Sequence, residues 1–153
     1  MNKSKFDELQ KMIIQIGLRK KLDVSVYSNP EFHWTQMNLI SCGLEKGLNV
    51  SLYAKTCFSW QQMVVIKLGL EKRLNVSLYA KPEFNFDQMW EIKIGLEEGL
   101  DVSGYARAEF DCGKMKQIRE FYQKKKIRVR IRRCFSQNQI GKMGLKYDRE
   151  IDD

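Results

Sequence analysis

The sequence repeats itself every 26 residues, and this period constrains the fold more than any other feature. Glycine recurs in four successive copies and phenylalanine in five, with no insertion or deletion between them. A unit this short cannot bury an apolar face alone, so successive copies are expected to stack on one another. The copies occupy residues 6–31, 32–57, 58–83 and 84–109, followed by a partial copy at 110–123. The recurring residues are Gly17, Gly43, Gly69 and Gly95, with Phe6, Phe32, Phe58, Phe84 and Phe110.

The first half of each copy has the pattern of an amphipathic helix. In the second copy His33 precedes Gln36 by three residues, and a polar residue precedes glutamine in the same way in the other copies. This spacing is typical of a capping box at a helix N-terminus. Met37 and Ile40 then continue an apolar face with helical spacing. We therefore expect a helix at about 34–46 and in the same register of each copy, with the recurring glycine close to a neighbouring helix or ring. The aromatic residues of one register are expected in the core: Trp34, Trp60 and Phe86.

The second half of each copy, LNVSLYAK in copy two, allows two interpretations. An Asn or Asp before the segment, with Val50 and Tyr53 three residues apart, favours a short second helix. The alternation of Leu48, Val50 and Leu52 is instead typical of a short strand, as in a leucine-rich repeat. Gly104 takes the register of Leu52 in copy four, where a core strand would tolerate glycine poorly. The favoured fold class is therefore all-α: a short α-solenoid of four two-helix repeats with a degenerate fifth helix.

Positive charge is concentrated after the repeats. Residues 84–109 carry six acidic and two basic residues, whereas residues 114–133 carry ten basic residues against one acidic residue. In 124–133, KKKIRVRIRR, apolar residues alternate with arginine, which predicts an extended, β-like segment with one apolar row and one basic row. We expect residues 124–153 to form a basic cap or tail separate from the array at 1–123. The basic row either solubilises the end of the array or binds nucleic acid or another polyanion. Its residues are Lys124, Lys125, Lys126, Arg128, Arg130, Arg132 and Arg133.

One tryptophan departs from the repeat. Trp90 occupies a register that holds methionine, asparagine and valine in the other copies. Because tryptophan is enriched at binding hot spots, Trp90 with Val64 and Val65 of the preceding copy is a candidate partner surface. The alternative is simple packing of Trp90 against the next copy.

No combination of residues predicts catalysis, a metal site or a cofactor. His33 is the only histidine and occupies a helix-cap register, and the four cysteines have no paired short spacing. Serines and tyrosines recur in every copy, which indicates a structural role. The sequence shows neither a secretion signal nor an apolar stretch long enough for a membrane span, so a cytoplasmic protein with reduced thiols is expected.

The repeat unit F-x-[WF]-x-Q-M-x-x-I-x-x-G-L-x-x-G-L-[DN]-V-S-x-Y-A resembles tandem-repeat proteins encoded by bacterial phages and other mobile elements. The resemblance spans about Phe6 to Tyr122. It implies a mobile-element setting and no catalytic residue. The resulting hypothesis is a non-enzymatic repeat protein that binds a protein or nucleoprotein complex, as an anti-CRISPR-like inhibitor of a host complex would. The alternative is direct nucleic-acid binding by the arginine-rich segment, with the repeats as a scaffold.

Overall fold

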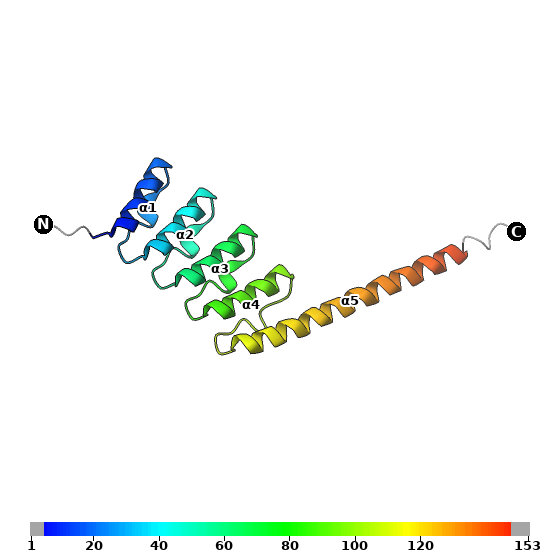
Figure 1. Cartoon of the computed structure of the whole chain (residues 1–153). Coiled ribbons are helices and arrows are strands. Elements are labelled where there is room, and N and C mark those ends of the chain that lie inside the picture. Colours follow the sequence, from blue (N-terminus) through cyan, green and yellow to red (C-terminus); the bar gives the residue numbers. More distant parts are fainter. Residues whose placement is uncertain (1–4, 148–153) are drawn as a thin grey trace.

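The chain is all-helical, as the repeat pattern predicts. The computed structural model describes residues 5–147, and side chains within 5–132. Within the described backbone there are five α-helices and no β-strand. The helices α1 to α4 lie side by side in chain order, and α5 starts beside α4 and then projects past the end of the row (Figure 1). Their bounds are α1 (Glu8–Arg19), α2 (Trp34–Glu45), α3 (Trp60–Glu71), α4 (Phe86–Glu97) and α5 (Cys112–Tyr147).

Each of the first four helices starts at a capping box, which confirms that part of the prediction. In α3 the Ser59 hydroxyl accepts a hydrogen bond from the Gln62 amide, and the Gln62 side chain accepts one from the Ser59 amide. In α2 the imidazole of His33 takes the place of the hydroxyl. Two orphan N–H groups are thereby satisfied at the same position in every copy, and this fixes where each helix begins.

Each helix ends in a backbone turn that needs a left-handed residue. The residue after the C-cap has φ of 57° at Lys21, 66° at Gly47, 56° at Arg73 and 63° at Gly99. At the end of α1 the amide of Leu22 donates to the Gly17 carbonyl over 3.0 Å, and the amide of Lys21 donates to the Leu18 carbonyl. This is a Schellman motif, whose bonds satisfy the last carbonyls of the helix and do not require glycine at every copy.

The segment after each turn is helical, as favoured, but very short. It forms a three-residue 3-10 helix in copies one to three (Val24–Val26, Val50–Leu52 and Val76–Leu78). Copy four has no 3-10 helix at the equivalent residues 102–104, and residues 103–105 form a turn. The strand alternative is therefore excluded for these segments, and the tyrosine that follows each one is directed back to its own long helix.

That tyrosine explains the recurring glycine. The Tyr79 side chain is fully buried, and its hydroxyl donates to the Val65 carbonyl over 3.3 Å. A Cβ at Gly69 would lie 2.8 Å from Val76 Cγ1 and 3.2 Å from Tyr79 Cζ, and still closer to the tyrosine hydroxyl. Burial raises the pKa of Tyr79, since its charged form would lose hydration. The predicted close approach of a ring to the glycine is thus confirmed, and the ring comes from the same copy.

Adjacent copies are joined by the glutamines of the capping boxes. The side-chain amide of Gln62 donates to the Phe84 carbonyl of the next copy over 2.6 Å, and this bond is buried. Gln10, Gln36 and Gln88 make the equivalent bonds to Phe32, Phe58 and Phe110, each 2.7 Å long. Fully buried methionine and isoleucine side chains fill the space between neighbouring helices. One glutamine therefore caps its own helix and fixes the position of the next copy.

The C-terminal segment differs from the prediction. Residues 124–133 are not extended, because they lie within the 36-residue helix α5, which crosses residues 123 and 124 without a break. The expected β-like segment is therefore wrong, and the apolar and basic residues do not form two opposite rows. Gly104 has a role in this arrangement, since a Cβ there would lie 3.3 Å from Cζ of Tyr122 in α5. The glycine makes room for the helix that covers copy four.

Candidate binding surfaces

The aromatic residues expected in the core lie on the surface. Trp34, Trp60 and Phe86 are 36%, 50% and 38% exposed. The prediction was wrong because it assigned one apolar face to each helix, whereas the sequence places apolar residues on two. In α3, Val64 and Gly69 are five residues apart, which is about 140° around an α-helix. The glycine side is filled by tyrosine, so the register of Trp60, Val64 and Leu68 faces outward.

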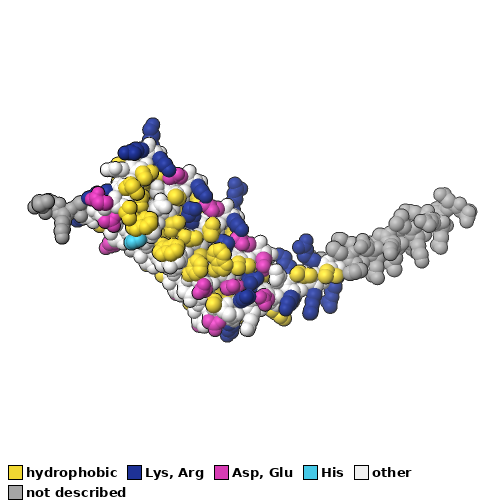
Figure 2. Space-filling model, viewed as in Figure 1, with side chains coloured by type: hydrophobic (Ala, Val, Ile, Leu, Met, Phe, Trp, Pro, Cys, Tyr) yellow, Lys and Arg dark blue, Asp and Glu magenta, His cyan; other side chains and the backbone are white. Residues whose placement is uncertain are grey.

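These registers form one continuous surface, here called the apolar band. Figure 2 shows apolar side chains gathered along the row of helices from α1 to α4. In α3 and α4 the residues at i, i+4 and i+8 share this face, whereas α1 has Glu8 and α2 has Asn38 at one of these positions. The band comprises Met12, Ile16, Trp34, Cys42, Trp60, Val64, Leu68, Phe86, Trp90 and Ile94, all of them exposed or half-buried.

The α4 end of the band holds a pair of aromatic rings. Phe86 and Trp90 stack with centroids 6.0 Å apart, and the ammonium of Lys93 lies 4.7 Å from the Trp90 centroid. Trp90 is 37% exposed, and half-buried Val64 lies in the same band. Val65 is fully buried and belongs to the core. Its assignment to a partner surface is therefore corrected.

Ion pairs link the copies near the C-terminal ends of the helices. Lys46 of α2 contacts Glu71 of α3 at 2.6 Å, and Lys20 to Glu45 and Lys72 to Glu97 are the equivalent pairs. Hydrogen bonds from Lys46 and Lys67 hold the pKa of Glu71 below its ordinary value. In these pairs the charged side chains of neighbouring copies neutralise one another.

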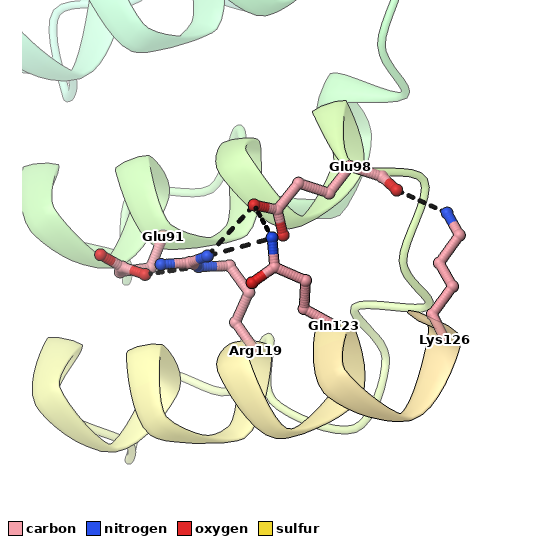
Figure 3. Close-up of polar contacts among 5 residues, drawn as sticks. All are labelled: Glu91, Glu98, Arg119, Gln123 and Lys126. Carbon is pink, nitrogen blue, oxygen red and sulfur yellow. Dashed lines mark hydrogen bonds and ion pairs between the residues drawn. The ribbon is translucent and has the colours of Figure 1, made fainter. Parts of the chain in front are cut away.

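A polar cluster holds α5 against α4 (Figure 3). Arg119, only 8% exposed, contacts Glu91 at 2.9 Å and Glu98 at 3.3 Å. Gln123 donates to the Glu98 carboxylate over 3.0 Å, and the Lys126 ammonium donates to the Glu98 and Gly99 carbonyls over 2.6 and 3.0 Å. Copy four has Glu98 where the earlier copies have a lysine, so the charge order at this joint is reversed. These contacts fix the direction in which α5 leaves the array.

The predicted polyanion-binding residues lie on the projecting part of α5. Lys124, Lys125, Arg128, Arg130 and Arg132 are exposed. Lys126 is exposed too, but its ammonium is bound to the α4 carbonyls. The side chain of Arg133 lies outside the described residues. Since successive residues of a helix are turned by ~100°, Lys124, Arg128 and Arg132 share one face of α5, and Lys126 and Arg130 lie on the opposite face. The three apolar residues among them are exposed as well: Ile127 by 50%, Val129 by 42% and Ile131 by 50%.

Among the residues considered for catalysis or metal binding, the single histidine has a structural role. His33 acts as the N-cap of α2, as predicted. Among the described side chains, Cys42 is half-buried, and Cys57 and Cys112 are exposed. No group of three or more His, Cys, Asp or Glu in this part of the chain could hold a metal ion. Within residues 5–147, no helix is both long and apolar enough to cross a membrane.

Comparisons of the chain with protein-family models, with curated proteins and with solved structures find no match. The candidate function therefore rests on two surfaces, the apolar band and the projecting part of α5. The sequence does carry a signal for the apolar band, because the aromatic register and the glycine register lie far apart around the same helix. Because the tyrosine of the same copy packs against the glycine, the aromatic register on the other side of the helix faces outward.

Proposed function

We propose that the chain is a non-enzymatic α-solenoid that binds a protein partner through the apolar band. The observation that carries this proposal is the exposure of Trp34, Trp60, Phe86 and Trp90 on one face of adjacent helices. Contiguous apolar surface of this kind marks interaction sites in soluble proteins. Tryptophan is also the residue type most enriched at the centre of binding interfaces.

The helices beneath the band support this function because they hold the aromatic residues in place. Each of these helices is capped at its N-terminus and tied to the next copy by a glutamine bond, which is buried for α1 to α3 and partly buried for α4. A rigid array loses little conformational freedom when it binds, so more of the interaction energy appears as affinity. One aromatic side chain per helix then offers a partner several contacts along the row.

The proposal can be tested by capture of partners on the purified, immobilised full-length chain. The test variant is Trp60→Ser with Trp90→Ser, and the matched control is Leu78→Ser, because Leu78 is 37% exposed but lies outside the band. Loss of a hot-spot side chain costs about 2 kcal/mol, which corresponds to ~30-fold in affinity. We expect a protein from the producing cells to be retained by the parent and the control and lost by the double variant. Equal retention by all three chains would refute the proposal.

A second candidate function is direct nucleic-acid binding by α5. It is favoured by the exposure of Lys124, Lys125, Arg128 and Arg130 on a helix that projects from the array. Contacts of this kind to phosphates release counterions, so affinity falls steeply with salt. A gel-shift series on the variant with Arg128, Arg130, Arg132 and Arg133 changed to alanine tests it. Unchanged binding by that variant, or binding that is independent of salt, would remove α5 from consideration.

The two surfaces on one molecule also fit a nucleoprotein partner. The apolar band would contact its protein part and α5 its nucleic acid, as expected for a mobile-element inhibitor of a host defence complex. The support for this narrower proposal is the presence of both surfaces together with the resemblance of the repeat unit. It is tested by adding the purified chain to nuclease complexes of the producing cells, and an absence of both binding and inhibition would contradict it.

A further inference from the structure

The two exposed surfaces of this molecule complement each other in charge and in apolar content. The α4 end of the apolar band lies in copy four, where Glu91, Glu97 and Glu98 are held in ion pairs within the chain but Asp87 is exposed. Glu83 and Asp87 are exposed beside Phe86 in the sequence, and acidic side chains gather at this end of the band in Figure 2. Residues 124–132 of α5 carry six basic residues, no acidic residue and three exposed apolar side chains. The exposed carboxylates of Glu83 and Asp87 can therefore pair with cations of α5 while the apolar side chains of the two surfaces contact each other.

The exposed apolar residues of α5 limit which kind of molecule can bind residues 124–132. Ile127, Val129 and Ile131 are each at least 42% exposed. A polyanion would contact the cations but would leave these side chains in water. Pairing of two α5 helices along this segment would bring like charges together, which is unfavourable. An acidic surface with exposed aromatic rings satisfies both the cations and the apolar side chains.

The same chain cannot supply both halves of this contact to itself. Arg119, Gln123 and Lys126 fix the start of α5 on α4, and the helix then continues away from the row without interruption. An unbroken helix does not fold back on the array that carries it. Val129 lines a cavity with residues 99–104 of its own chain, but Ile127 and Ile131 do not. These two side chains can therefore reach only a band that belongs to another molecule.

We infer that residues 124–132 of one chain bind the α3–α4 part of the apolar band of a second copy. The inference rests on the proposed function of the band and names its occupant. Each copy carries both surfaces, so two chains exchange their α5 helices reciprocally and close a two-fold dimer. The contact places Ile127 and Ile131 against Trp60 and Trp90, with the arginines of α5 beside the acidic margin of α4.

The inference is tested by light scattering coupled to size exclusion on the full chain. Parent protein at up to about 100 μM is expected to reach twice the monomer mass of 18.1 kDa. The band variant Trp60→Ser with Trp90→Ser and the α5 variant Ile127→Asn with Ile131→Asn should each dimerise at least ~10-fold more weakly. Leu78→Ser and Lys55→Glu are the controls, since both residues are exposed outside the two surfaces, and they should match the parent. Circular dichroism checks that every variant keeps the helical content of the parent.

Mixing the variants gives a sharper result than either variant alone. A reciprocal dimer of two band variants loses both contacts, and so does a dimer of two α5 variants. A mixture of the two variants keeps one intact contact, because an unchanged α5 meets an unchanged band. The mixture is therefore expected to form a heterodimer of intermediate affinity, and parent dimerisation should weaken as salt rises.

Two results would overturn the inference: a parent chain that stays monomeric over the whole concentration range, or a mixture that associates no better than its separate variants. Neither result bears on capture of a foreign protein by the band. If the parent is monomeric and Trp60 and Trp90 are still needed for capture, the proposed function stands and its occupant is a different protein. If dimerisation succeeds and no partner depends on the band, the band serves self-association alone.

Discussion

Replacement of Gly69 by alanine tests the packing of each repeat most sharply, because two physical effects predict opposite signs. Helix propensity alone favours alanine over glycine inside α3 by ~1 kcal/mol. The added Cβ, however, would lie 2.8 Å from Val76 Cγ1 and 3.2 Å from Tyr79 Cζ. The tyrosine side chain is fully buried. Overpacking of this kind costs about 1–3 kcal/mol.

Gly69→Ala would also break a hydrogen bond of the tyrosine. When the Tyr79 ring shifts, its hydroxyl loses the 3.3 Å bond to the Val65 carbonyl, which is a loss of about 1 kcal/mol. The net expectation for Gly69→Ala is a destabilisation of about 1–3 kcal/mol after the gain in propensity. Urea denaturation followed by circular dichroism measures it as a lower midpoint.

The control for this prediction removes the hydroxyl that the Cβ would meet first. Tyr79→Phe leaves the ring in place, so Gly69→Ala should cost less in the Tyr79→Phe background than in the parent. A double-mutant cycle gives this coupling directly. An increase in stability for Gly69→Ala, or equal costs in the two backgrounds, would refute the account of the recurring glycine.

Three further predictions concern the joints between copies. Gln62→Ala removes both the capping bond and the bond to the next copy, so unfolding free energy should fall by about 2 kcal/mol; Gln61→Ala, one residue away on the same helix, is the control in the same urea assay and should be near neutral. The pKa of Glu71 is lowered in the folded chain, so its ion pairs contribute stability above the unfolded pKa of ~4.3, and this stability is lost as the pH falls through the folded value. Glu71→Gln should therefore be less stable than the parent at pH 7, and its stability should decline less steeply in acid. Identical pH profiles of the two chains would contradict this. Gly104→Leu restores the residue found in copies two and three but meets Tyr122; hydrogen exchange should show weaker protection in α5 with α1 to α3 unchanged, and unaltered protection of α5 would argue against a spacing role for the glycine.

The sequence predicts the contents of one copy well because the determinants are local. The capping pairs, such as Ser59 with Gln62, satisfy backbone groups within one turn, so their spacing is sufficient evidence. The close approach at Gly69 also follows from the cost of glycine in a helix. These features depend on neighbours within the same 26 residues.

Relations between copies were harder to predict. The Gln62 bond to Phe84 joins residues 22 apart, and capping already explains the glutamine without it. Trp60 was assigned to the core because apolar character alone does not say which of two apolar faces is covered. The tyrosine that fills the glycine side decides this, and its direction is a property of the folded turn.

The secondary structure of the C-terminal segment was mispredicted for a different reason. Alternation of Ile127, Val129 and Ile131 with arginine has the period of a strand, yet α5 starts as the fifth copy of the repeat and continues as a helix. Lysine and arginine are good helix formers, and no proline or paired glycine interrupts the helix after Gly113. Continuation of an existing helix is favourable once its first turns are packed, because nucleation has already occurred.

Site-specific photocrosslinking in the producing cells tests the role of the apolar band most directly. A photoreactive phenylalanine at Trp60 reports on whatever touches the centre of the band, and the same group at Leu78 reports on an exposed apolar position outside it. A protein adduct, to a second copy or to another protein, is expected at position 60 and absent at position 78. No adduct at position 60, or the same adducts at both positions, would contradict the assignment of this surface to protein binding.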